Sequence, residues 1–207
     1  MRHNEGINLT KKWFQFLCLS TDCRELPKPG DIVIGFDGDA WDHPHVVLFR
    51  RFVEEFWEPR RRYVLLLPCS PRKPYYTSNF RKILYYHMTR LNLWEHVELV
   101  TVSDLLGLVP KEFEGVYPAA NYEYPPSLMK KYGHEEELIE LLGRQMKKLR
   151  KTINYAWMPK TYIPIIKKAS QIASIDIKIR TYSTLPFKTA ATIPKTLYNI
   201  IHNPNSK

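Results

Sequence analysis

The stretch Tyr63-Val64-Leu65-Leu66-Leu67 is apolar at every position. A strand buried on one face alternates apolar and polar residues, whereas a continuous apolar run predicts a central strand that is covered on both faces. Strands of this kind are typical of parallel sheets flanked by helices. Pro68 and Cys69 follow the stretch directly, so we expect a thiol at the end of a buried strand.

The segments on either side of this strand alternate between helical and extended patterns. The predicted helices are 44–57, 79–93, 135–150 and 162–174, and the further predicted strands are 97–102, 153–157 and 175–181. Strands that alternate with helices predict an α/β fold, a three-layer sandwich with a mostly parallel central sheet.

The two ends of the chain carry weaker patterns. Residues 1–43 are interpreted as an N-terminal lead-in that packs on the core, with a short helix around Leu9–Leu17 and a short strand at Asp31–Phe36. A short helix is expected from Thr192, and 201–207 is expected to be a frayed tail. The predicted catalytic domain is therefore 44–200.

The charge balance is strongly basic, with 31 Lys and Arg against 21 Asp and Glu and a net charge of +10. Such a domain attracts polyanions, and RNA or DNA is the usual partner. A basic protein from a host with a basic proteome is the alternative interpretation. No apolar run approaches the ~20 residues of a membrane span, and the polar N-terminus lacks a signal-peptide pattern. We expect a cytoplasmic protein with no membrane partner.

The three cysteines are Cys18, Cys23 and Cys69, and their spacing matches no zinc-ligand pattern. A disulfide is not expected in a reducing compartment. No GxxxxGK phosphate-binding pattern occurs. We therefore expect no metal and no cofactor.

Three predicted strands run into polar loops, at 68–78, 103–123 and 158–162. Ligands of open α/β sheets bind outside the carboxyl ends of the strands, so these loops should converge on the site. Cys69 is the candidate nucleophile, because the nearby cations Arg72 and Lys73 would lower the pKa of its thiol. A small buried thiol is the alternative. Lys73 is a proton donor, a phosphate contact or a solvated loop charge.

Other residue types in the loops suit recognition of a base. The tyrosines that could stack on an extruded base are Tyr75, Tyr76, Tyr117 and Tyr122, although simple packing also explains tyrosines. Glu112 and Glu123 could hold a base edge or transfer protons, or they are surface charges. The candidate RNA contacts are Arg72, Arg81, Lys147, Lys148, Arg150 and Lys151, although helical lysines are more often a solvated face.

Three ordered motifs carry a family resemblance. Pro68-Cys69-x3-Lys73-Pro74-Tyr75-x2-Ser78 resembles the PC-x3-KPY-x2-S signature of archaeosine synthases. The segments 107–112 (GLVPKE) and 117–120 (YPAA) resemble that family's GVVPRE and YPAA segments, in the same order. The likeness covers 44–182. It implies that Ser70, Ser78, Gly107, Pro110 and Asn121 line the substrate site together with the tyrosines.

The resemblance also implies an activity and partners. Such enzymes act on tRNA that carries 7-cyano-7-deazaguanine in its D-arm, and they join the side-chain amine of free lysine to the nitrile carbon. A radical-SAM partner then removes the lysine carbon skeleton. The fold implied is similar to uracil-DNA glycosylase. Either Cys69 adds to the nitrile and lysine displaces it, or lysine attacks directly.

The sequence departs from the family pattern at three positions. Arg81 and Asn121 replace histidines, and Glu123 replaces an aspartate. Larger members also carry a transglycosylase-like region and an RNA-binding PUA domain, which do not fit in 207 residues. The chain is thus interpreted as a minimal or split archaeosine synthase. The alternatives are a non-catalytic tRNA-binding subunit and a glycosylase-type enzyme that processes bases.

Overall fold

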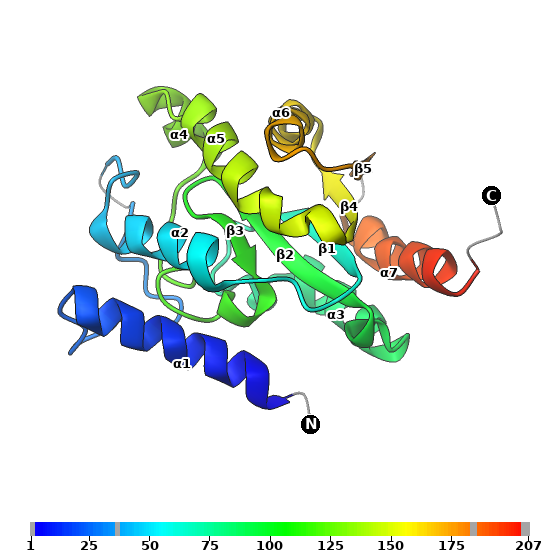
Figure 1. Ribbon diagram of the computed structural model, residues 1–207, viewed down its shortest axis with the longest axis horizontal. Helices are drawn as coiled ribbons and strands as arrows, with labels where there is room; N and C mark the ends of the chain where they lie inside the picture. Colours follow the sequence, from blue (N-terminus) through cyan, green and yellow to red (C-terminus); the bar gives the residue numbers. More distant parts are fainter. Residues whose placement is uncertain (1–2, 36–37, 183–185, 204–207) are drawn as a thin grey trace.

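The computed structural model describes residues 3–35, 38–182 and 186–203. Its centre is a five-stranded sheet with the order β3-β2-β1-β4-β5 (Figure 1). The strands are β1 (Tyr63–Pro68), β2 (Val97–Ser103), β3 (Gly107–Pro110), β4 (Ile153–Met158) and β5 (Ile177–Thr181). β1, β2, β4 and β5 are parallel, and β3 runs antiparallel to β2 at one edge.

Helices cover both faces of the sheet. They are α1 (His3–Ser20), α2 (Pro44–Phe56), α3 (Asn79–Arg90), α4 (Pro126–Tyr132), α5 (Glu135–Met146), α6 (Ile163–Ala173) and α7 (Pro186–His202). Short 3-10 turns lie between them: η1 (Tyr75–Thr77), η2 (Leu93–Glu95), η3 (Lys111–Phe113), η4 (Lys147–Lys151) and η5 (Lys160–Tyr162). The predicted three-layer α/β sandwich with a mostly parallel sheet is confirmed.

The strand β1 shows why two layers of helices are needed. Val64 and Leu66 belong to a core that includes residues of α1, α2, α5 and α6. Leu65 and Leu67 belong to a second core with residues of α3 and α7. All four side chains are fully buried. The uninterrupted apolar run therefore does mark a strand that is covered on both faces.

Several boundaries differ from the predicted ones. The expected strand at 31–36 is reduced to one bridge between Ile34 and Tyr122. The expected helix at 135–150 ends at Met146 and continues as the η4 turn, and α7 begins at Pro186 rather than at Thr192. Residues 204–207 of the predicted tail lie outside the described residues, while 201–202 are still helical. The segment 107–110, expected as a loop, pairs with β2.

The N-terminal segment is more than a short helix on the surface. α1 runs from His3 to Ser20, and its Trp13 and Leu17 are fully buried in the core. The indole nitrogen of Trp13 donates a hydrogen bond of 2.6 Å to the carbonyl of Tyr117. The helix therefore holds the chain segment that precedes Tyr122. Within the described ranges, no helix is both long and apolar enough to cross a membrane.

The expectation of three free thiols is wrong. Cys18 and Cys23 form a disulfide, with their Cα atoms 5.1 Å apart. The turn that follows α1 brings the two residues together, and an argument from the redox compartment could not foresee that proximity. Cys69 is the free cysteine.

Candidate active site

The candidate site is built where three neighbouring parallel strands end. Pro68 of β1 pairs with Val102 of β2, and the amide of Cys69 donates to the Val102 carbonyl at 2.8 Å. The next residue after β2 is Asp104, and the thiol of Cys69 lies 3.8 Å from Asp104 Oδ2. The hydroxyl of Tyr162, which follows β4, donates to Asp104 Oδ1. Strand order thus joins a thiol, a carboxylate and a phenol.

Lys73 closes the site from the loop after β1. Its Nζ donates to the Ser70 carbonyl at 2.6 Å. The same nitrogen lies 4.5 Å from the ring centre of Tyr75 and 4.3 Å from that of Tyr122. Burial lowers the pKa of Lys73, although the nearby Cys69 and Asp104 partly oppose that effect. A buried ammonium of this kind is a better proton donor than a solvated lysine.

The thiol of Cys69 is not activated in the way that its neighbours in sequence suggest. Burial, and then the charge of Asp104, raise its pKa to about 11, despite the opposing effect of Lys73. Lys73 acts in the predicted direction, but burial outweighs it, so the predicted net lowering of the pKa of this thiol is wrong. Burial also raises the pKa of Asp104 to about 6. At neutral pH the resting pair is a thiol that donates to a carboxylate.

Three hydroxyls form a directed chain beside the lysine. The Oγ of Ser103 accepts from the amides of Leu105 and Leu106 at 3.1 and 2.9 Å. With its acceptor sites used, its proton must point to the Tyr122 hydroxyl, 2.6 Å away. Tyr122 in turn donates to the Tyr75 hydroxyl at 2.6 Å.

Tyr75 and Tyr122, the two tyrosines of this hydrogen-bonded series, are therefore not free to stack on a base. Tyr75 is fully buried and Tyr122 is 1% exposed. Their rings lie against the ammonium of Lys73 rather than open to an extruded base. They shape the surroundings of Lys73 and Cys69.

The prediction that Arg81 contacts RNA is wrong. Its side chain is buried, and Nη2 donates to Thr101 Oγ1 at 2.7 Å and to the Pro68 carbonyl at 3.2 Å. The same nitrogen lies 3.7 Å from Glu114 Oε1 in an ion pair in which both side chains are 2% exposed. Arg81 therefore fastens α3 to the ends of β1 and β2. Position in the sequence alone could not show that it lies on the inner face of α3.

The two predicted carboxylates lie at different places. Glu112 belongs to η3, which follows the antiparallel strand β3. Besides the adjacent Lys111, the charges that act on it are those of Glu98 and Arg60, at the amino end of β2. The structure does not bring it to Cys69. Glu123 is exposed, but its charge acts on Lys73. Only Glu123 lies near the candidate site.

Ser70, Ser78 and Gly107 have local structural partners. The Oγ of Ser70 accepts from the amide of Arg72, which is itself exposed, and the Oγ of Ser78 caps α3 by accepting from Arg81 N. Gly107 has a φ of +73°, and a Cβ atom there would lie 2.3 Å from Gln145 Oε1. The glycine thus permits the turn that presents Asp104.

Pro110, Tyr117 and Asn121 also serve the fold. Pro110 pairs with Val100, and the Tyr117 hydroxyl lies 2.6 Å from His45 Nδ1. The Nδ2 of Asn121 donates to the carbonyls of Lys28 and Asp31 at 2.6 and 2.9 Å. Asn121 therefore holds the N-terminal segment, and Gly30 of that segment lies beside Lys73 and Pro74.

Sequence reasoning missed Asp104, Tyr162 and Ser103 as members of the site. All three follow predicted strands closely in the sequence, so their position at the sheet edge was a usable signal. Their residue types were not distinctive. The pairing of Asp104 with both Cys69 and Tyr162 depends on strand order.

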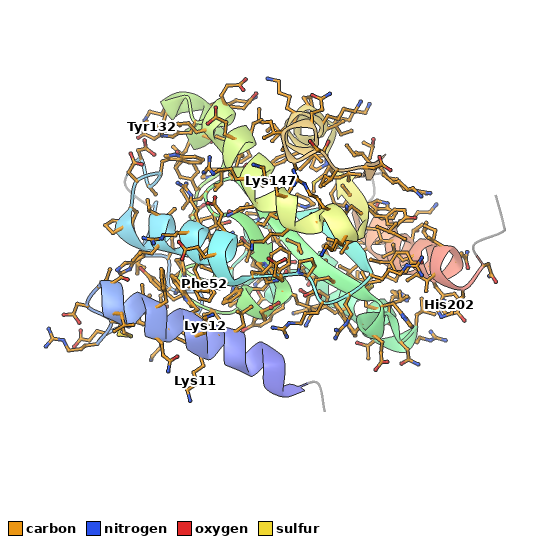
Figure 2. All side chains as sticks on the ribbon, viewed as in Figure 1. Lys11, Lys12, Phe52, Tyr132, Lys147 and His202 are labelled. Carbon is orange, nitrogen blue, oxygen red and sulfur yellow. A yellow bond between two sulfur atoms is a disulfide. The ribbon has the colours of Figure 1, made fainter. Side chains whose placement is uncertain are left out.

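Four of the other predicted RNA contacts gather at the opposite end of the sheet, namely Lys147, Lys148, Arg150 and Lys151, whereas Arg72 is exposed in the loop after β1. We call the following residues the basic groove: Arg144, Lys147, Lys148, Arg150 and Lys151, with Glu54 and Glu58. The groove has a volume of about 510 Å³. Lys148 pairs with Glu58 at 2.8 Å, whereas Lys147 (Figure 2) and Lys151 are exposed. η4 comes just before β4, and that strand spans about 20 Å, so the groove lies far from Cys69.

These features define an α/β protein with its reactive groups at the carboxyl edge of a parallel sheet, the position at which this class binds ligands. The chain belongs to the DUF5591 family, described as a domain of unknown function, whose model matches residues 46–197. The matched range includes Cys69, Lys73, Asp104 and Tyr162.

Two curated relatives bear out the resemblance to archaeosine synthases. One segment is 37% identical over 86 residues to archaeosine synthase subunit alpha of Methanosarcina acetivorans, covering 41% of this chain and 13% of that protein. A segment is also 31% identical over 83 residues to archaeosine synthase subunit alpha of Thermoplasma acidophilum, covering 40% of this chain and 16% of that protein. The aligned segments thus span a small part of those relatives.

A solved structure shares the fold. The crystal structure of AF0587, described as a protein of unknown function, matches with a TM-score of 0.51 and 20% identity. The match covers 72% of this chain and 48% of that one. At this identity the likeness concerns the fold alone.

Proposed function

We propose that this chain takes part in archaeosine biosynthesis by adding lysine to the nitrile of 7-cyano-7-deazaguanine in tRNA. The observation that carries the proposal is the proximity of Cys69 and Lys73, both in buried surroundings, at the carboxyl edge of the sheet. The two relatives named archaeosine synthase subunit alpha support the pathway. The PC-x3-KPY-x2-S motif contributes both reactive groups.

The chemistry of a nitrile suits these two groups. Its carbon is electrophilic, so the sulfur of Cys69 adds to it and gives a thioimidate. Lys73 supplies the proton that the nitrile nitrogen requires. The amine of free lysine then attacks the same carbon and displaces the sulfur, which leaves an amidine and restores the thiol. Glu123, exposed beside Lys73, is placed to attract the incoming ammonium of the lysine substrate.

We propose that the basic groove binds phosphates of the tRNA. Its exposed cations and the net charge of +10 favour a polyanion. A partner chain completes the enzyme in this proposal, because both relatives are named as subunits and are far longer than the aligned segment. The candidates for that partner are the radical-SAM protein and the PUA-type or transglycosylase-like region that the resemblance to archaeosine synthases implies.

The test is incubation of the protein with tRNA that carries 7-cyano-7-deazaguanine and with isotopically labelled lysine, followed by digestion and mass spectrometry. A nucleoside heavier by one lysine supports the proposal. An abasic tRNA that forms without lysine would instead indicate a glycosylase. Binding of tRNA without turnover by the chain alone, and turnover on adding a partner chain that Cys69→Ser leaves unchanged, would indicate a non-catalytic subunit.

A further inference from the structure

Asp104 is a buried carboxylate in contact with the free cysteine, and no motif of the chain includes it. We propose that Asp104 is the general base that removes the proton of the Cys69 thiol when the sulfur attacks a nitrile, with Tyr162 as its positioning residue. This inference rests on the nitrile chemistry of the proposed function and deepens it.

The geometry singles out one oxygen of Asp104 for the thiol. Oδ2 lies 3.8 Å from the sulfur, and Oδ1 accepts from the Tyr162 hydroxyl. Because Tyr162 occupies Oδ1, the carboxylate is held with its other oxygen toward Cys69. The turn beyond β2 fixes the backbone, and Gly107 with its φ of +73° allows that turn to return as β3.

A base is needed because the resting cysteine is a neutral thiol. Burial and the charge of Asp104 raise the pKa of Cys69 far above neutrality. The thiol is a much weaker nucleophile than the thiolate. Asp104, with a pKa raised to about 6, is charged at neutral pH and is a stronger base than an ordinary aspartate.

The neighbouring groups are less suited to this step. Lys73 donates to the Ser70 carbonyl and is the acid of the reaction. The hydroxyls of Tyr75 and Tyr122 bond to one another, and burial raises the pKa of each well above its usual value. The carboxylate of Glu112 lies at the other end of β2.

The step balances in atoms and electrons. The S–H proton moves to Oδ2 of Asp104 as the sulfur forms a bond to the nitrile carbon. One electron pair of the C≡N bond moves to nitrogen, which takes a proton from the Lys73 ammonium. The proton on Asp104 then replaces the one that Lys73 gave up. The product is a neutral thioimidate, and nothing is oxidised or reduced.

The test uses two small electrophiles on the full chain. 2-Cyanopyrimidine is an aryl nitrile that forms a thioimidate with a thiol, and intact-mass spectrometry at pH 7 measures its rate of addition to Cys69. Iodoacetamide needs the same loss of the thiol proton but takes up no proton itself, and urea denaturation serves as the control for folding. The variants are Asp104→Asn and Tyr162→Phe, and Asp42→Asn replaces an exposed aspartate as the matched control.

Both probes should slow when Asp104 is replaced, while the free energy of unfolding changes little. Asp104→Asn should slow nitrile addition by about 100-fold or more, the usual contribution of a general base. Iodoacetamide labelling should slow as well, because the thiol must lose its proton before it is alkylated. Tyr162→Phe should give a smaller loss with the nitrile and an altered pH profile, and Asp42→Asn should match the wild type.

Each other outcome has a defined meaning. Equal nitrile addition to the wild type and to Asp104→Asn, or no addition to the wild type, would overturn the inference. A loss with both probes that is accompanied by a large fall in the free energy of unfolding would show that the Asp104→Asn substitution only disturbs the fold around Cys69, and the base role would be rejected. Asp104-dependent nitrile addition without lysine transfer to tRNA would refute the proposed function and leave the inference standing.

Discussion

The two ends of the sheet use the same kind of residue in opposite surroundings. At the carboxyl end, Lys73 and Arg81 are enclosed and bonded to carbonyls, a hydroxyl or a carboxylate. At the amino end, Lys147 and Lys151 of the basic groove are exposed. The chain thus divides its cations between a buried site and an open surface.

The comparison of the two ends shows how burial changes the behaviour of a charged side chain. Burial lowers the pKa of Lys73, so its proton becomes easier to transfer, and it makes Arg81 depend on its partner Glu114. An exposed lysine keeps its ordinary charge and its freedom to move, which suits it to phosphates but makes each contact weak and sensitive to salt. We therefore expect large, local effects at one end and modest, salt-dependent ones at the other.

The largest effect should come from the thiol. Cys69→Ser should lower the rate of lysine addition to tRNA by about 1,000-fold or more, because a serine hydroxyl in this site is a far weaker nucleophile. The measurement is labelled lysine per tRNA over time, and tRNA affinity is the control that should not change. Full turnover by Cys69→Ser would favour direct attack by lysine.

The buried ion pair should dominate stability. Arg81→Ala should reduce the free energy of unfolding by about 3–5 kcal/mol, because it leaves the carboxylate of Glu114 buried without its partner. Urea denaturation measures this loss. Lys147→Ala is the matched change at the exposed end, and it should stay within about 0.5 kcal/mol of the wild type. Similar losses of unfolding free energy in both variants would contradict the expected difference between the buried and the exposed end of the sheet.

Charge reversal in the basic groove should act on tRNA binding alone. Lys147→Glu with Lys151→Glu should weaken affinity about 10- to 100-fold for all tRNAs alike and reduce the salt dependence by about 1 unit of slope per lost phosphate contact. Filter binding at several salt concentrations measures both. Iodoacetamide labelling of Cys69 should stay unchanged, and unaltered tRNA affinity would exclude the groove from the RNA surface.

The smallest effect is a pH dependence at the carboxyl end. Asp104 has a pKa raised to about 6, and the protonated acid cannot accept the thiol proton. Nitrile addition should therefore be nearly level above about pH 7 and fall about 10-fold from pH 7 to pH 5. Asp104→Asn should remove this fall, and a wild-type rate that stays level to pH 5 would argue against the carboxylate.

Much of the site could be anticipated from local pattern, and the rest could not. The apolar run at 63–67 predicted the central strand, and the residues that follow it predicted Cys69 and Lys73 at the sheet edge. The direction of the pKa shift of Cys69 was predicted wrongly. Arg72 is close to Cys69 in sequence but exposed, whereas Asp104 is distant in sequence and lies 3.8 Å from the thiol. The prediction that Arg81 contacts RNA failed for a similar reason, because its partner Glu114 comes from another segment of the chain.

The sequence by itself determined the α/β class, the basic charge and the place of Cys69 at the sheet edge, because these depend on periodicity, composition and a short contiguous motif. Only the tertiary structure decided which carboxylate faces that thiol, which cations are buried, and that Cys18 and Cys23 are joined. Strand order and helix packing set distances between residues far apart in the chain. Burial, which those distances create, then sets the pKa of each group.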